Sequence, residues 1–288
     1  MPLSREAPPP DYSVALVSAE ALLNSPTPNR LFIDVRLGDP AAELSNYQDC
    51  HIYGAVYAQI RDVFAGLPTQ LSGNLPLPNL VDLNQELAVW GVGIDTEIVV
   101  YGPSPALAAR GWWVLRWAGL TKVRVLDGGL KAWISAGGPV ARGTASPRPT
   151  TAPLLLGGGH LAQIDAKNLL AVLESDSAAP LLIDARNEDA YQAGHIRGAR
   201  NIPASSLWTP SGTLRGPEAL TRQLSDVGAD DVHQVIIYCG GGVLSALTYL
   251  VLEQTRTTKP TPLLYVGSWS EWIKEPARLQ LTRSGSAA

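Results

Sequence analysis

An internal duplication constrains this chain more than any other feature. Four short segments of the first half return in the second half, in the same order. The matched pairs are LFIDVR and LLIDAR (31–36, 181–186), HIYGAVYAQI and HIRGARNIPA (51–60, 195–204), EIVVYG and QVIIYC (97–102, 234–239), and VLDGGLKAW and LYVGSWSEW (125–133, 264–272). This order predicts two domains with the same fold.

Composition indicates where one copy ends and the next begins. Residues 137–160 are rich in Gly, Pro, Ser and Thr, which is typical of a linker. We therefore predict a first domain over residues 11–142, a linker over 143–159 and a second domain over 160–288. A chain of 288 residues with 45% hydrophobic content is long enough for two domains of ordinary size. The proline-containing start, residues 1–10, is expected to be a frayed tail.

Each copy alternates two kinds of segment. Apolar runs such as VIIY (235–238) and PLLYV (262–266) predict strands buried on both faces. The segments AKNLLAVLES (166–175) and VLSALTYLVLEQ (243–254) carry helical spacing. This alternation predicts the α/β class, with a parallel sheet in each domain and helices on both faces of it. Reactive groups in such sheets lie at the carboxyl ends of strands.

Charge and composition argue against several classes of function. The net charge is -4, from 22 basic and 26 acidic residues without long blocks, so neither nucleic acid nor a membrane surface is an expected partner. No run approaches the roughly 20 apolar residues of a membrane span, and the N-terminus lacks the pattern of a secretory signal. We expect a cytoplasmic protein. Two cysteines without CxxC spacing or a Cys/His cluster predict no disulfide, no metal and no cofactor.

One of these cysteines, Cys239, stands between a predicted strand and a predicted helix. The glycines that follow it allow backbone N–H groups to point at the sulfur, and the helix dipole also favours the thiolate over the thiol. An accessible thiolate at this position is a nucleophile. The alternative is a small buried hydrophobe followed by a tight turn, which three consecutive glycines make less attractive. The loop amides expected to bind the sulfur belong to Gly240, Gly241, Gly242, Val243 and Leu244.

The ordered set of motifs resembles the two-domain rhodanese-type sulfurtransferases over nearly the whole chain. The motifs that carry the resemblance are D-x-R at 34–36 and 184–186, GHIRGARNIP at 194–203, YCGGGVLSA at 238–246 and GSWSEW at 267–272. The resemblance implies two tandem rhodanese-like domains, with Cys239 as the catalytic cysteine. It also implies that the first domain covers the site without catalysing, because Gly102 stands where a cysteine would be.

The resemblance further implies covalent catalysis through a persulfide. The Cys239 thiolate would attack the outer sulfur of a small donor, and a thiophilic acceptor would remove that sulfur. Cyanide, a thiol or a thioredoxin-like protein are the expected acceptors. No general base is required, so His51 and its counterpart His195 are expected to be structural, and Cys50 is expected to pack in the first domain.

The residues of the loop bear on the identity of the sulfur donor. The loop CGGGVL is nearer to the CGSGVT of 3-mercaptopyruvate sulfurtransferases than to the CRKGVT of thiosulfate sulfurtransferases, although Gly241 replaces the serine and Leu244 the threonine. The arginines that the mercaptopyruvate branch places after D-S-R are missing. Thiosulfate sulfurtransferase, or a non-catalytic persulfide carrier or interaction module, remain alternatives. The candidates for donor binding are Arg61, Asn74 and Arg186, the last with a competing reading as a buried ion pair.

Overall fold

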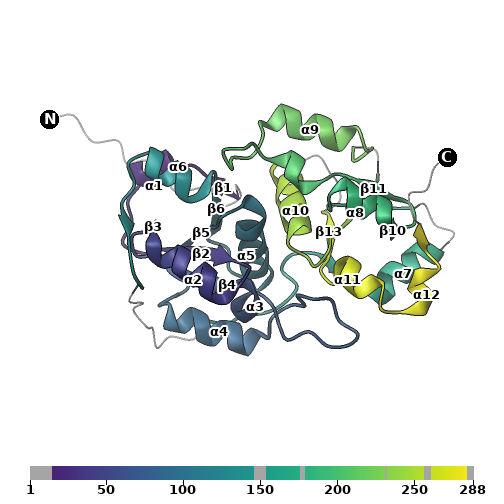
Figure 1. Ribbon diagram of the computed structural model, residues 1–288, viewed down its shortest axis with the longest axis horizontal. Helices are drawn as coiled ribbons and strands as arrows, with labels where there is room; N and C mark the ends of the chain where they lie inside the picture. The colour runs from purple at the N-terminus through teal and green to yellow at the C-terminus, as the bar shows by residue number, and fades with distance from the viewer. Residues whose placement is uncertain (1–14, 146–153, 176–178, 231, 256–260, 284–288) are drawn as a thin grey trace.

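The computed structural model describes residues 15–145, 154–175, 179–230, 232–255 and 261–283. The predicted tail, the first residues of the first domain, the last residues of the second and part of the linker lie outside the described residues. Two α/β units lie side by side, with the N-terminal half of the chain forming one and the C-terminal half the other (Figure 1). The predicted domain boundaries remain predictions.

The first domain is built on a parallel five-stranded sheet in the order β1-β6-β5-β2-β4. Its strands are β1 (Leu16–Val17), β2 (Arg30–Arg36), β4 (Val56–Gln59), β5 (Glu97–Tyr101) and β6 (Val123–Leu126), and β3 (His51–Ile52) pairs separately with β7 (Val140–Ala141). Its helices are α1 (Ala19–Asn24), α2 (Pro40–Asp49), α3 (Ile60–Val63), α4 (Leu80–Val89), α5 (Pro105–Trp117) and α6 (Gly129–Ser135).

The second domain repeats this topology. Its parallel sheet has the order β11-β9-β12-β13-β8, in which each strand corresponds to one of the first sheet. The strands are β8 (Gln163–Ile164), β9 (Leu181–Asp184), β11 (Ala199–Asn201), β12 (Val235–Tyr238) and β13 (Leu263–Tyr265), with β10 (His195–Ile196) paired to β14 (Thr282–Arg283). The helices are α7 (Ala166–Glu174), α8 (Glu188–Ala193), η1 (Ala204–Leu207), α9 (Pro217–Ser225), α10 (Leu244–Thr255), α11 (Ser268–Trp272) and α12 (Pro276–Leu279). The predicted α/β class and duplication are confirmed.

Both faces of each sheet are covered, as the continuous apolarity of the strands predicts. In β5, Ile98 and Val100 pack into one hydrophobic cluster, whereas Val99 and Tyr101 pack into another on the opposite face. In β12, Ile237 belongs to the first of these clusters and Ile236 to a third. Successive strand residues therefore meet helices on alternate sides, which leaves only the strand ends free for chemistry.

Short polar side chains set the starts of several helices. Asp39 accepts a hydrogen bond from the backbone N–H of Ala42 at the start of α2, and Asp165 accepts one from Asn168 at the start of α7. These contacts satisfy amides that have no partner inside the helix. α5 begins without a side-chain cap, and its Pro105, like Pro40 of α2, stands in the first turn, where the missing N–H costs nothing.

The duplicated motifs hold the same internal contacts in each domain. Asp34 pairs with Arg36 in the first domain, and Asp184 pairs with Arg186 in the second. Each histidine of the H-I motif stacks on a tyrosine of the preceding helix, with ring centroids 4.1 Å apart for His51 and 3.9 Å apart for His195. These contacts brace the sheet edges and give both histidines a packing role.

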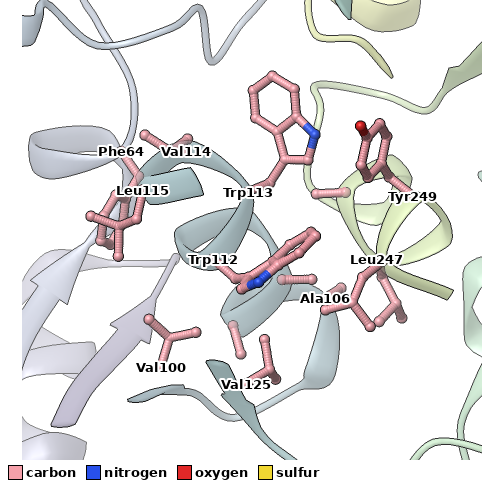
Figure 2. Close-up of a cluster of buried hydrophobic side chains, with 14 of the residues drawn as sticks. Phe64, Val100, Ala106, Trp112, Trp113, Val114, Leu115, Val125, Leu247 and Tyr249 are labelled. Carbon is pink, nitrogen blue, oxygen red and sulfur yellow. The ribbon is translucent and has the colours of Figure 1, made fainter. Parts of the chain in front are cut away.

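The two domains meet through the helices α5 and α10. Figure 2 shows Trp112 and Trp113 of α5 facing Leu247 and Tyr249 of α10, and the Trp113 and Tyr249 rings cross edge-on at 6.1 Å. One continuous hydrophobic cluster includes residues of both domains. Each of these helices follows the loop at the same place in its domain, so their packing brings the two loop regions together. Among the described helices, none is both long enough and apolar enough to cross a membrane.

We predict that Trp113→Ala lowers the free energy of unfolding by about 3–5 kcal/mol, because it empties a buried site at the domain contact. Denaturant unfolding measures the loss. Ile94→Ala is the control, since Ile94 is 80% exposed and its truncation should change stability by less than about 0.5 kcal/mol. Similar losses in both variants would contradict the assigned interface.

Candidate active site

Cys239 lies directly after β12, at the carboxyl end of the central strand of the second sheet. Residues 240–243 form the loop, and α10 begins at Leu244. Gly242 adopts a positive φ of 85°, a conformation that glycine reaches without steric cost. The strand end, the loop and the helix start therefore place the thiol where the sequence predicts it.

The sulfur of Cys239 accepts hydrogen bonds from three groups, of which the Ser268 hydroxyl is the most distant, at 4.0 Å. The backbone N–H of Gly242 donates to Sγ at 3.1 Å, and the hydroxyl of Ser245 donates to it at 3.3 Å. Among the described contacts, the amides of Gly240, Gly241, Val243 and Leu244 make no hydrogen bond to this sulfur. Of the five loop amides predicted to bind the sulfur, only that of Gly242 does so in the free thiol, among the described contacts.

The start of α11 braces the loop from the other side. The Cys239 N–H donates to Ser268 Oγ at 3.2 Å, and the carbonyl oxygens of Cys239 and Gly240 accept from the N–H groups of Trp269 and Ser270. Ser268 has a φ of 56°, the one non-glycine residue in the left-handed region among those described. This costs energy, and the hydrogen bonds to the loop offset it.

The predicted accessibility of the thiol is wrong for this conformation, because Cys239 is only 1% exposed. The chain between α3 and α4 reaches across to the second domain (Figure 1), and residues 66–77, here called the covering segment, lie over the loop. Asn74 donates its N–H to Ser270 Oγ at 3.0 Å, and Lys274 Nζ donates to the carbonyl oxygens of Thr69 and Ser72. The first domain therefore covers the thiol.

The three predicted donor-binding residues are placed in three different settings. Asn74 is exposed, and a Cβ on Gly241 would lie 4.0 Å from its Cβ, so it stands beside the loop. Arg186 pairs with both oxygens of Asp184, donates to the Gly194 carbonyl and lies 4.4 Å over the Trp269 ring. These contacts favour its structural interpretation.

Arg61 is not brought to the loop. It is exposed on α3 and lines a hollow whose other residues all belong to the first domain, such as Asp82 and Glu86 of α4. Within the described residues, no hydrogen bond or ion pair joins it to the second domain. Arg61 is a candidate because it lies in the domain expected to cover the site, but the short helix α3 places it in a hollow shared with α4.

Sequence reasoning missed two side chains near the sulfur. Ser245 was detectable from the sequence. Leu244 replaces the threonine of the related loop, and the next residue, Ser245, carries a hydroxyl. Arg110 was not, because it lies in α5 of the other domain and reaches the Gly242 carbonyl at 3.4 Å only through domain packing. Arg110 is fully buried.

The equivalent position in the first domain leaves no room for a side chain. A Cβ on Gly102 would fall well inside contact distance of the Val35 carbonyl oxygen, which is backbone and cannot move aside cheaply. The backbone of this copy therefore excludes a cysteine at position 102. Cys50, at the end of α2, is half-buried in the first domain. Within the described part of the chain, no cluster of His, Cys, Asp and Glu forms a metal site.

Comparison with known families decides what this arrangement is. The profile of the rhodanese-like domain matches the chain twice, at residues 17–136 and 165–275. The chain belongs to the rhodanese family. The predicted resemblance is thereby confirmed, and the thiol loop lies inside the second of the two rhodanese-like domains.

The relatives of this rhodanese-family chain are sulfurtransferases. It is 35% identical over 270 residues to a protein of Pseudomonas aeruginosa named "Probable 3-mercaptopyruvate sulfurtransferase", covering 87% of this chain and 92% of that one. It is 29% identical to the thiosulfate sulfurtransferase of Rattus norvegicus, covering 84% of each chain. The crystal structure of SseA from Escherichia coli, described as a 3-mercaptopyruvate sulfotransferase, superposes with a TM-score of 0.75 at 27% identity, over 90% of this chain and 100% of that one. The protein is a sulfurtransferase.

We predict that Ser245→Ala slows reaction of Cys239 with a sulfur donor by about tenfold or more, because the anionic sulfur loses a buried hydrogen-bond donor. Single-turnover kinetics measure the effect. Thr248→Val is the matched control, since that hydroxyl is also buried in α10 but contacts the Leu244 carbonyl instead of the sulfur. Equal rates for the two variants would remove Ser245 from the site.

Proposed function

We propose that this chain moves a sulfane sulfur from a small donor of the 3-mercaptopyruvate type, through a persulfide on Cys239, to a thiophilic acceptor. The observation that carries the proposal is the setting of Cys239, whose sulfur receives the Gly242 N–H and the Ser245 hydroxyl at the start of α10. Both donors stabilise an anionic sulfur, and so does the positive end of the helix dipole.

The first half-reaction forms a sulfur–sulfur bond. The Cys239 thiolate attacks the thiol sulfur of the donor, and the carbon–sulfur bond breaks with its electron pair going to the carbon, which gives the enolate of the keto acid. The proton of the transferred sulfur passes to that carbon, so the products are an anionic Cys239 persulfide and the keto acid. No external oxidant or reductant is consumed, because the electron pair of the broken carbon–sulfur bond stays on the carbon, which is reduced as the transferred sulfur is oxidised from the thiol to the sulfane level.

The second half-reaction restores the enzyme. An acceptor thiol, or cyanide, attacks the outer sulfur of the persulfide, the sulfur–sulfur bond breaks, and its electron pair returns to Cys239 as thiolate. In this proposal the outer sulfur of the persulfide accepts hydrogen bonds from the amides of Gly240, Gly241, Val243 and Leu244. These amides are available because, of the loop amides, the free thiol is contacted by that of Gly242. Gly240 and Gly241 leave space here, because a Cβ on Gly240 would meet nothing within 4 Å and one on Gly241 would come no nearer than 3.9 Å to a neighbouring atom.

The proposed donor class rests on charge. No cation occurs between Cys239 and Ser245, so a dianion such as thiosulfate meets only dipoles in the loop. A monoanionic keto acid loses less binding free energy than a dianion when the loop has no cation. The exposed Asn74 beside Gly241 offers a side-chain amide for its polar groups. The relative in Pseudomonas aeruginosa, whose name specifies mercaptopyruvate, and SseA support the same class.

The acceptor and compartment follow from the same chemistry. The persulfide must be discharged by a thiol, by cyanide or by the thiol of a thioredoxin-like protein. Both cysteines are free thiols in the structure, and the proposed cycle requires Cys239 in that state. We therefore propose the cytoplasm, which keeps thiols reduced, as the place of action.

Cys239→Ser is expected to abolish sulfur transfer while leaving the fold intact, and Cys50→Ser is expected to retain most activity. Mass spectrometry after exposure to each donor should find one added sulfur on Cys239 and none on Cys50. Turnover that persists without Cys239 would refute the assignment. A loaded persulfide that no acceptor can discharge would instead support the carrier alternative.

Donor preference is tested by steady-state kinetics with one fixed thiol acceptor. We expect kcat/KM for 3-mercaptopyruvate to exceed that for thiosulfate by about tenfold or more, because one fewer charged contact costs about 1.5–3 kcal/mol for the dianion. Asn74→Ala should raise KM for mercaptopyruvate more than it lowers kcat. A higher kcat/KM for thiosulfate would overturn the proposed donor class.

A further inference from the structure

The non-catalytic domain places a buried cation against the catalytic loop. Arg110 of α5 is 0% exposed, and its guanidinium donates to four backbone carbonyl oxygens. Two are close, Phe64 at 2.9 Å and Leu75 at 3.1 Å, and two are longer, Pro76 and Gly242, each at 3.4 Å. The side chain thus joins the base of the covering segment to the loop that follows Cys239.

No acid among the described residues pairs with this guanidinium. Within the described residues Arg110 forms no ion pair, and Cys239 is the ionisable group that acts on its charge. Burial lowers the pKa of Arg110 to about 10, and the nearby Cys239 opposes that lowering. Arginine at that value is still cationic at neutral pH. Carbonyl dipoles satisfy its N–H groups but leave a whole positive charge in a medium of low polarity, which is costly without a counter-charge.

Gly242 links the guanidinium to the sulfur. Its carbonyl accepts from Arg110 while its own N–H donates to Cys239 Sγ. A Cβ at this residue would lie 2.8 Å from both Arg110 Nη1 and the Val266 carbonyl oxygen, and its φ is positive. The residue is therefore clamped in one conformation, and that conformation aims its N–H at the sulfur.

We propose that Arg110 is a positioning residue for Cys239: it fixes Gly242 and supplies, from the non-catalytic domain, a positive charge beside the buried sulfur. This inference rests on the proposed persulfide cycle, in which both the thiolate and the persulfide carry a negative charge. The CGGGVL loop contains no cation of its own. In this proposal the guanidinium of Arg110, on the interface helix α5, supplies the positive charge from beneath the loop.

Other charged groups around the loop are engaged elsewhere. Asp184 and Arg186 neutralise each other beneath β9 and β12. Glu271 of α11 acts on Tyr265, whose pKa is raised by burial first and by that carboxylate second. Glu253, further along α10, faces Arg116 and Tyr249. Substitution of Arg110 therefore changes one charge near the loop and leaves these other charges in place.

The test follows the ultraviolet absorbance of the thiolate against pH in a Cys50→Ser parent, where Cys239 is the single thiol. We expect Arg110→Gln and Arg110→Met to raise the midpoint by about one pH unit or more, and Arg110→Lys to shift it by less than half as much. A residue that only tied the domains together would behave alike in all three variants. The readout needs no donor, so a wrong donor class leaves it valid.

Arg116→Gln is the matched control, since it removes the same charge from the same helix but contacts Thr121 instead of the loop. Its midpoint should equal that of the parent. Unchanged midpoints in Arg110→Gln and Arg110→Met, with near-ultraviolet circular dichroism showing an intact fold, would overturn the proposal.

A second measurement leaves Arg110 intact, in case neither neutral variant folds. If the thiolate is the counter-charge, the free energy of unfolding of the parent, taken relative to Cys239→Ser, rises with pH across the thiolate midpoint. The sign follows because the folded state then binds the thiol proton less tightly than the unfolded chain. A difference between the two proteins that does not vary with pH would contradict the pairing.

Discussion

The packing of α5 on α10 is the contact on which the site depends. Both helices begin directly after the loop of their own domain, so pairing them sets the first domain against the catalytic loop of the second. Indole and phenol rings fill this contact and remain almost free of solvent. This apolar contact continues the core of one domain into the other, and it holds the first domain against the residues that donate to the thiol.

Duplication explains what each copy has kept. The Asp–Arg pair and the stacked histidine occur in both domains, because they hold a strand end and a sheet edge that every copy needs. The thiol occurs in one copy, since the backbone around Gly102 has closed over the space a side chain would fill. The first domain is therefore free to contribute differently, through its covering segment and through α5.

The sequence predicts those parts that depend on local pattern. Strands buried on both faces, the repeat and the place of Cys239 are all readable, because each depends on residues close together in the chain. Arg110 is not readable, since its contact with Gly242 spans 132 positions and exists only after the domains dock. The placement of Arg61 is not readable either, because the hollow that it lines forms only when α3 and α4 pack together.

Burial of the thiol has a chemical purpose within the proposed cycle. A persulfide exposed to solvent can be discharged by any thiol, whereas one held beneath the covering segment reacts only when that segment admits an acceptor. The segment contacts the second domain through the half-buried Ser270 and the exposed Lys274, and the hydrogen bonds of the latter are weakened by water. Its base, in contrast, is held by the buried Arg110 at Leu75 and Pro76. The covering segment is therefore held at two places of different character, one on α11 and the following residues and one on the buried cation beneath the loop.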